Sequence, residues 1–310
     1  MKTLTTLITI LTLSQFSAAA LNSTTEAQGP SVVCETCTAN QAHMTLKELA
    51  EVLSKIETDK TPDNIHSMQI DVRKKENSHA NAVGRIFDPN TRAAGTGFIA
   101  EKECLVLTAK HTACANISDG KCLNQNHKLI FEVGKKKNSM TDKFDYETSG
   151  TVVGFGHYQS SGDSGDWALI KIKKQNNKNI GELIKPLKIY LMPEEEYKDL
   201  PIKMYGYPMN KGLSKLYADN DCKALSTRRG QTTYSCNGSK GYSGGPVIAH
   251  DDDGAPWVVG LVSGAAKWSS NDNKEDGFMF MQSFEPEYSV KNRKTDGQEI
   301  QELINETTCD

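Results

Sequence analysis

The chain has 310 residues, of which 37% are hydrophobic, and a formal net charge of −3. This length is enough for one large domain or two smaller ones with a real core. The weak net charge gives no strong electrostatic attraction to nucleic acid or to a membrane surface, so we expect neither as a partner.

The first twenty residues begin with one lysine, continue as an apolar run rich in threonine, and end in small residues. This order is typical of a secretory signal peptide, with cleavage after Ala20. The apolar run is too short to span a bilayer, and no other segment reaches the length needed. We therefore expect a soluble monomer that is exported, either to the periplasm or out of the cell.

The segment 21–79 is polar and shows little strand pattern. One amphipathic helix is predicted over 44–57, where Thr45 and Glu48 form a capping box. The segment is either a propeptide or an extension that packs on the main domain, and both alternatives stay open. We place the main domain at residues 80–310.

From about residue 81, short apolar runs alternate with glycine, asparagine and aspartate. Such a succession predicts an all-β barrel or sandwich, and no strand–helix alternation indicates a parallel sheet. The acidic stretch 250–256 predicts a hairpin turn, since its spacing matches no calcium loop. Apolar residues at helical spacing predict a C-terminal helix over 297–308. The predicted strands are 82–87, 95–100, 104–109, 128–133, 150–156, 166–172, 202–208, 245–250, 256–264 and 277–284.

Eight cysteines in an exported chain favour disulfides over metal sites. The CxxC motif at 34–37 has no second CxxC or paired histidines beside it, so we expect no metal. Cys222 and Cys236 flank a predicted hairpin and form the best-supported pair. The three cysteines between 104 and 122 are crowded, which favours one bond among them.

The stretch 241–246, Gly-Tyr-Ser-Gly-Gly-Pro, places Ser243 in a glycine-rich turn that enters a strand. A serine hydroxyl becomes a nucleophile when a histidine, itself oriented by a carboxylate, removes its proton. The nucleophile elbow of α/β-hydrolases requires an acid and then a histidine after the serine. Only His250 follows Ser243, and no parallel sheet is predicted, so we set that arrangement aside.

The opposite chain order, histidine, then aspartate, then serine, fits the sequence. His111 follows the strand that ends in Thr-Ala, Asp166 heads the strand DWALIKI, and Ser243 lies in GYSGGPV. In these motifs the chain resembles the chymotrypsin-like (trypsin-fold) serine peptidases, whose signatures are T-A-x-H, D-x-A-L-[ILV] and G-x-S-G-G-P. The resemblance covers about residues 81–290 and is closest to the compact bacterial members, including the glutamyl endopeptidases. Each motif alone would indicate only a structural histidine, a strand edge or a turn, and the other histidines are expected to be structural.

The resemblance implies two six-stranded antiparallel β-barrels and a serine endopeptidase that acts on proteins or peptides without a cofactor. Ser243 would be the nucleophile, His111 the general base and later the acid, and Asp166 the orienting carboxylate. The backbone N–H groups of Gly241 and Ser243 would form the oxyanion hole. Ser263 would donate a hydrogen bond to Asp166.

The resemblance also locates the substrate pocket. No acid is evident there, so a basic P1 residue lacks a counter-charge, and Val262 stands where glutamyl endopeptidases carry a histidine. We expect a small or apolar, uncharged P1 residue. The substrate-binding residues would be Asn237, Gly238, Ser239, Ser263, Gly264 and Ala265, with Ala265 and Phe278 as walls.

The stretch 162–165, Gly-Asp-Ser-Gly, mimics the usual serine signature of this family but lacks the following Gly-Pro. We interpret it as a loop that presents Asp166, with Asp163 as the alternative acid.

Tyr242 departs from the digestive members of the family, in which an aspartate at this place pairs with a newly freed α-amino group. Tyrosine cannot form that ion pair, so we expect activity that does not require a buried free N-terminus at residues 80–85. Two alternative functions stay open on the same fold. One is a catalytically silent secreted binding protein, against which the intact His111, Asp166 and Ser243 argue, and the other is a serine esterase or acyltransferase that uses the same triad.

Overall fold

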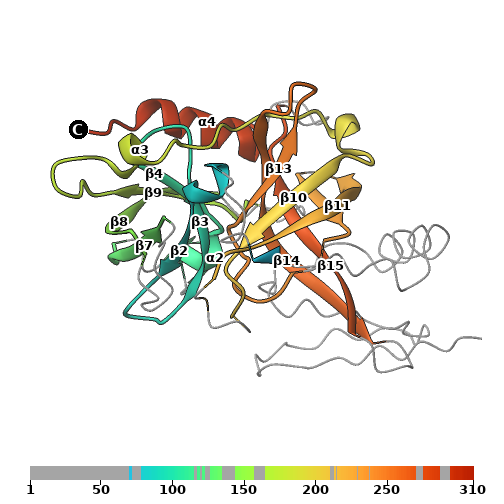
Figure 1. Cartoon of the computed structure of the whole chain (residues 1–310), viewed down its shortest axis with the longest axis horizontal. Helices are drawn as coiled ribbons and strands as arrows, with labels where there is room; N and C mark the ends of the chain where they lie inside the picture. The colour runs from blue at the N-terminus through green and yellow to red at the C-terminus, as the bar shows by residue number, and fades with distance from the viewer. Residues whose placement is uncertain are drawn as a thin grey trace, which may run out of the picture.

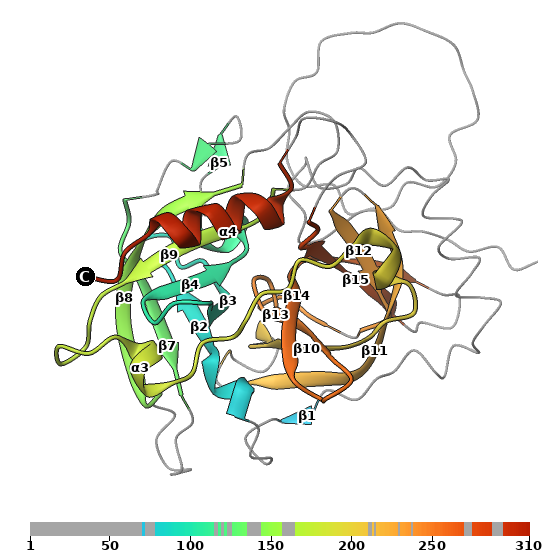
Figure 2. The same ribbon diagram turned by 90° about the horizontal axis from the view of Figure 1, so that it is seen from above.

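The computed structural model describes residues 70–71, 78–114, 117–118, 121–122, 126–134, 144–156, 165–209, 213, 215–228, 230–236, 238–269, 275–286 and 294–310. They form two antiparallel β-sheets that lie side by side, with one longer helix, α4, across the first of them (Figures 1 and 2). The predicted all-β class is confirmed. The predicted signal peptide and the helix at 44–57 lie outside the described residues.

The first sheet is a closed barrel of six strands in the order β2-β3-β4-β9-β8-β7. In β7 buried residues alternate with half-buried ones, because successive side chains of a strand point to opposite faces and only one face fills the barrel. In β4 every residue is buried. The strands are β2 Val83–Phe87, β3 Ala94–Ile99, β4 Leu105–Thr108, β7 Leu129–Val133, β8 Tyr146–Phe155 and β9 Ala168–Ile172.

The second sheet has seven strands in the order β1-β11-β10-β13-β14-β15-β12, and β11 also pairs with β12. Six of these strands therefore close into a second barrel, as predicted, and β1 extends it at β11. Residues of the predicted N-terminal extension thus belong to this sheet. The strands are β1 Ile70–Asp71, β10 Pro201–Gly206, β11 Tyr217–Arg228, β12 Gln231–Tyr234, β13 Pro246–His250, β14 Pro256–Ser269 and β15 Glu275–Ser283.

The predicted hairpin turn between β13 and β14 is confirmed, and Asp251 organises it. Its carboxylate accepts hydrogen bonds from the Ala255 N–H at 2.7 Å and from Trp257 Nε1 at 2.9 Å. The smaller elements are the two-stranded sheet β5 Ile117–Ser118 and β6 Lys121–Cys122, and the short helices η3 Ser78–Ala82, α2 Lys110–Ala113, α3 Ile180–Leu183 and η4 Glu194–Tyr197. Across the described ranges, no helix is both long and apolar enough to cross a membrane.

The predicted C-terminal helix is confirmed as α4, Asp296–Glu306. Thr295 caps its start and forms a capping box with Gln298. Ile300 and Ile304 are buried on one face, as their spacing predicts. Leu303 packs on β8 at Gly154, where a Cβ would come within 2.3 Å of a Leu303 methyl group.

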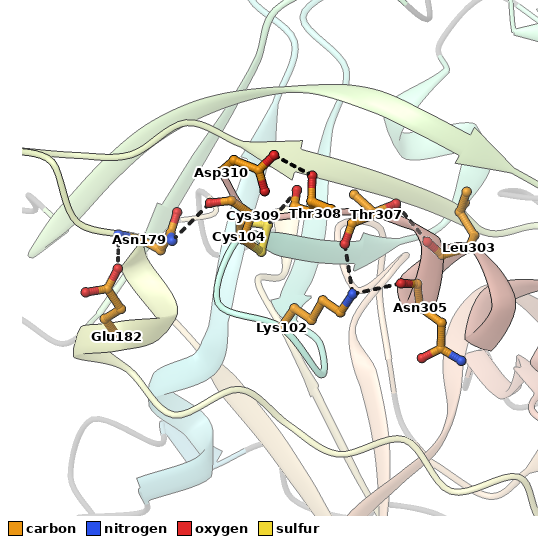
Figure 3. Close-up of a disulfide and its surroundings, with 10 residues drawn as sticks. All are labelled: Lys102, Cys104, Asn179, Glu182, Leu303, Asn305, Thr307, Thr308, Cys309 and Asp310. Carbon is orange, nitrogen blue, oxygen red and sulfur yellow. Dashed lines mark hydrogen bonds between the residues drawn. A yellow bond between two sulfur atoms is a disulfide. The ribbon is translucent and has the colours of Figure 1, made fainter.

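The end of α4 is joined to the first barrel by a disulfide between Cys104 and Cys309 (Figure 3). Beside it, Lys102 Nζ donates hydrogen bonds to the carbonyls of Asn305 at 3.1 Å and Thr307 at 2.8 Å. Cys104 therefore takes no part in the bond predicted among the three cysteines between 104 and 122, and that prediction now concerns Cys114 and Cys122. Sequence proximity could not indicate the pairing of Cys104 with Cys309, because the fold brings the C-terminus to the start of β4.

The predicted bond between Cys222 and Cys236 is confirmed, and it closes the hairpin of β11 and β12. Cys114, which follows α2 directly, is also disulfide-bonded.

Candidate active site

His111 lies in α2, a single helical turn that follows β4 directly. Its ring Nδ1 lies 2.9 Å from Oδ2 and 3.1 Å from Oδ1 of Asp166. The backbone N–H of His111 donates a second hydrogen bond to the same carboxylate, at 3.1 Å. The imidazole side chain keeps 17% of its surface exposed, whereas Asp166 keeps 5%. One edge of the ring is therefore held by a buried carboxylate.

Asp166 stands two residues before β9, and Ser263 of β14 reaches it from the second barrel. The Ser263 hydroxyl donates a hydrogen bond to Asp166 Oδ2 at 2.7 Å, as the sequence resemblance implied. Both residues are buried. The two barrels thus supply different donors to one carboxylate.

For both Asp166 and His111, burial shifts the pKa in one direction and their pairing shifts it in the other. Burial alone would raise the pKa of Asp166, but the charge and hydrogen bonds of His111, together with the Ser263 bond, bring that pKa below its usual value. Burial alone would lower the pKa of His111, and the Asp166 charge and hydrogen bond raise it above its usual value of 6.5. An ionised Asp166 fixes the proton of neutral His111 on Nδ1, which leaves Nε2 as a proton acceptor.

Ser243 lies in a tight turn against the segment that carries His111. The Ser243 carbonyl accepts a hydrogen bond from the Thr96 N–H at 2.9 Å. The next residue, Gly244, has φ of +84°, and a Cβ there would come within 2.1 Å of Thr108 Oγ1 and 2.7 Å of the Ala109 nitrogen. Only glycine allows this approach. Among the described residues, the Ser243 hydroxyl forms no hydrogen bond with the His111 ring.

Two backbone donors of the turn around Ser243 have no hydrogen-bond partner among the described residues. Gly241 has φ of +99°, and a Cβ there would lie 2.2 Å from the Tyr207 carbonyl oxygen. The Gly241 carbonyl is held by Thr96 Oγ1 at 2.7 Å. Within the part of the chain that the structure describes, the N–H groups of Gly241 and Ser243 donate no hydrogen bond. Two buried, unpaired N–H groups are suited to an anionic oxygen of a ligand or reaction intermediate.

The remaining predicted pocket residues are only partly placed. Gly264 follows Ser263 on β14 and is buried, and Gly238 and Ser239 are half-buried in the approach to Gly241. Asn237 and the alternative acid Asp163 are not among the described residues. Of Ala265 and Phe278, only the backbone is described.

The other described histidines lie in different surroundings. His79 and His250 face each other with ring centroids 5.9 Å apart. His127 Nδ1 lies 3.4 Å from Oδ2 of Asp88, in a different part of the first barrel.

Two charged residues of this region, Lys110 and Asp296, were not predicted from the sequence. Lys110 precedes His111, and its buried Nζ donates a hydrogen bond to the Gly156 carbonyl at 2.7 Å. Asp296 begins α4 and contacts the residues on both sides of Asp166. For Lys110 the sequence offered one signal, a lysine directly before the histidine of T-A-K-H. A lysine that is buried beside such a histidine needs partners for its charge. The role of Asp296 had no local signal, because its contacts are 129 or more residues away.

The family model for trypsin matches residues 72–286, more than half of the chain and all four of His111, Asp166, Ser243 and Ser263. The chain belongs to the trypsin family. This trypsin-family member is a serine endopeptidase, a hydrolase whose substrates are proteins or peptides.

Solved structures similar to this trypsin-family chain include three peptidases, each 15% identical to it. A thermostable serine protease, AL20, from an extremophilic microorganism has a TM-score of 0.49, covering 67% of this chain and 94% of its own. The protease Anisep from Arthrobacter nicotinovorans has a TM-score of 0.47, covering 67% and 92%. A Glu endopeptidase in complex with MPD has a TM-score of 0.48, covering 77% and 94%. No curated protein matches this chain in a sequence search.

Proposed function

We propose that the protein is a secreted serine endopeptidase that cleaves peptide bonds through His111, Asp166 and Ser243 by way of an acyl-enzyme. The observation that carries the proposal is the buried Asp166 carboxylate, which accepts hydrogen bonds from His111 Nδ1 and from Ser263. This pairing gives His111 the tautomer and the raised pKa that a general base for serine requires.

The chemistry follows from this arrangement. His111 Nε2 accepts the Ser243 proton as Oγ attacks the carbonyl carbon of the substrate, and Asp166 stabilises the imidazolium that forms. The negative charge on the carbonyl oxygen is stabilised by the N–H groups of Gly241 and Ser243. His111 then gives its proton to the leaving amine, and the acyl group stays on Ser243. Water, deprotonated by His111, releases the acyl group and restores the serine.

The step from His111 to Ser243 requires their side chains to come within hydrogen-bond distance. In a protein without substrate such contacts are often long, and they shorten when substrate binds. Support for the pairing comes from the backbone, because the Gly244 backbone lies directly against Thr108 and Ala109 of the His111 segment.

We propose that activity does not depend on a free N-terminus at residues 80–85. Tyr242 is fully buried in the second barrel, where its ring packs against Gly206. Val83 starts β2 of the first barrel, and its carbonyl accepts a hydrogen bond from the Tyr207 hydroxyl at 3.4 Å. Protein that begins at Val83 and protein with extra N-terminal residues should have equal kcat/KM. Activity found only with one new terminus would refute this part of the proposal.

Export is supported by the predicted signal peptide and by two disulfides that suit an oxidising compartment. The described residues near Ser243 include buried Val262 and Gly264, so a small or apolar P1 residue stays our expectation for specificity.

The test combines a peptide library with ester substrates. Wild-type protein should cleave peptides, and Ser243→Ala should abolish cleavage. Ser164→Ala is the matched control, because Ser164 stands in the misleading Gly-Asp-Ser-Gly sequence. Hydrolysis of esters alone would indicate an esterase. A folded protein that cleaves neither substrate would indicate a silent binding protein, and either result would contradict the proposal.

A further inference from the structure

We propose that Asp296, the first residue of α4, is a positioning residue for Asp166, so that the C-terminal helix is part of the catalytic apparatus. The inference rests on the proposed function, since it assigns a role in the same reaction. Asp296 acts through its neighbours, and its own contacts are with residues of the chain.

Asp296 holds the residues on both sides of Asp166. Its Oδ2 accepts a hydrogen bond from the Gly165 N–H at 3.2 Å, and its Oδ1 accepts one from Trp167 Nε1 at 3.0 Å. All of these groups are buried. Hydrogen bonds to a charged acceptor are stronger than neutral ones, and burial strengthens them further. One carboxylate of α4 therefore fixes the backbone before Asp166 and the side chain after it.

The end of β8 supports the same segment from the other side. The Gly156 N–H donates a hydrogen bond to the Trp167 carbonyl at 2.9 Å. A Cβ at Gly156 would lie 2.3 Å from the Gly165 carbonyl oxygen, so the two backbones are in direct contact. Asp166 is thus held between Asp296 and the end of β8, which limits the positions that its carboxylate can take.

Asp296 also offsets a buried positive charge next to His111. Lys110 Nζ lies 4.6 Å from the centre of the Phe155 ring. Burial lowers the pKa of Lys110, while the negative charges of Asp166 and Asp296 act in the opposite direction. If Asp296 were neutral, Asp166 would have to offset Lys110 while it also stabilises the His111 imidazolium.

The helix is fixed where it begins and where it ends. Thr295 Oγ1 donates a hydrogen bond to the Glu285 carbonyl at 2.5 Å. At the other end, the bond between Cys104 and Cys309 ties the chain to the start of β4, the strand that leads to His111 (Figure 3). Figure 2 shows α4 lying across the first barrel. Side chains on such a rigid support hold catalytic groups in place better than side chains on loops.

The test is Asp296→Asn in the full chain, with kcat and KM measured per active site titrated. The asparagine carbonyl can accept only one of the two bonds, and the charge is lost. We expect kcat to fall by about 10²-fold, the typical effect of a displaced catalytic group. KM should change less than about twofold, because Asp296 is buried against Gly165 and Trp167 and supports the site from behind. Asp296→Glu, which restores the charge, should recover part of the loss.

The control is Glu302→Gln, on the same helix with the same change of charge. Glu302 is exposed and pairs with Lys294 at the surface. This variant should keep the kcat of the parent. A residue with a merely structural role would lower the melting temperature and leave kcat per titrated site unchanged, and this result for Asp296→Asn would overturn the proposal.

A second readout separates this proposal from the proposed function. NMR titration of the His111 ring needs no turnover. Asp166 acts on this ring directly, and Asp296 is linked to it through Lys110, on which both carboxylates act. Loss of the Asp296 charge should lower the pKa of His111, while Glu302→Gln should leave it in place. An unchanged pKa would overturn the role of Asp296 even in an active enzyme. A lowered pKa in a protein without peptidase activity would instead contradict only the proposed function.

If Asp296→Asn fails to fold, Trp167→Phe tests the same contact from the other side. It removes the Nε1 donor and leaves the Gly165 bond. We expect a loss of kcat smaller than about 10²-fold, again with KM within about twofold. An unchanged kcat in that variant would contradict the proposal.

Discussion

The carboxylate of Asp166 accepts hydrogen bonds from two groups of His111, the backbone N–H at 3.1 Å and the ring Nδ1 at 2.9 Å. The backbone N–H of His111 keeps the carboxylate in place, so rotation of the ring about its side-chain bonds would break the Nδ1 contact. The pair therefore fixes the direction of Nε2 relative to α2. The raised pKa of His111 and the lowered pKa of Asp166 are the electrostatic consequence of the same contact.

The first prediction concerns Asp166→Asn. The amide cannot hold the Nδ1–H tautomer by charge, so kcat should fall about 10⁴-fold, as in other triads of this kind. In the parent, His111 must be neutral to act as a base. Because its pKa is raised, the acid limb of kcat/KM should have its midpoint above pH 6.5. In the variant this midpoint should move to lower pH. A variant within tenfold of the parent would contradict the role of Asp166.

Tyr242→Phe should leave catalysis intact and preserve or increase stability. The Tyr242 hydroxyl is buried without a hydrogen-bond partner among the described residues, and burial raises its pKa far above the usual range. Removing an unsatisfied buried hydroxyl should increase the free energy of unfolding by about 1 kcal/mol. Urea unfolding and kcat/KM check both parts. A loss of 2 kcal/mol or more, or a tenfold loss of kcat/KM, would mean that the hydroxyl has an essential partner.

Glu285→Gln should change how stability depends on pH. Burial, and next the charge of Glu194, raise the pKa of Glu285 to about 7 from its usual 4.5. A raised pKa in the folded state means that the protonated acid stabilises the fold, an effect that is complete below pH 4.5 and lost as the pH rises through about 7. Glutamine does not ionise and still accepts hydrogen bonds from Gly230 and Ser283.

Relative to the parent, Glu285→Gln should therefore gain about 3 kcal/mol of unfolding free energy between pH 4.5 and pH 8. Unfolding by urea at several pH values measures this difference, with Glu302→Gln as the exposed control. If the difference in unfolding free energy between variant and parent stayed constant over this pH range, the pKa of Glu285 would not be raised in the folded state, and the prediction would be wrong.

The two described disulfides should differ in their contribution to stability. The bond between Cys104 and Cys309 spans 205 residues, and the bond between Cys222 and Cys236 spans 14. In the chain-entropy model, the long loop contributes about 5 kcal/mol and the short loop about 3 kcal/mol. Replacing each pair by serines and comparing the free energies of unfolding tests this order. If removal of the Cys222–Cys236 bond lowered the free energy of unfolding more, local packing rather than chain entropy would determine how much each disulfide stabilises the protein.

The strands and the motifs around His111, Asp166 and Ser243 were recognisable in the sequence because their signals are local. Alternating or continuous apolar runs marked most strands of both barrels, and His111, Asp166 and Ser243 each stand at a strand end inside a short motif. The hairpin bond between Cys222 and Cys236 was also local. The capping box at Thr295 made the start of α4 recognisable in principle, since it uses residues three apart.

The contacts that were missed all join distant parts of the chain. The pairing of Cys104 with Cys309 depends on where α4 packs, and one contact of that packing is Leu303 on Gly154. The hydrogen bonds of Asp296 with Gly165 and Trp167 depend on the same packing. No pattern within a short window contains this information, because it arises only when the barrel and the helix are assembled.

The most direct test of the central claim is to find the residue that reacts with a fluorophosphonate. After digestion, mass spectrometry should locate the label on Ser243, and labelling should be slow in His111→Ala, absent in Ser243→Ala, and lost in heat-denatured protein. A label on another residue of the native protein, or no label on protein shown to be folded, would contradict the account.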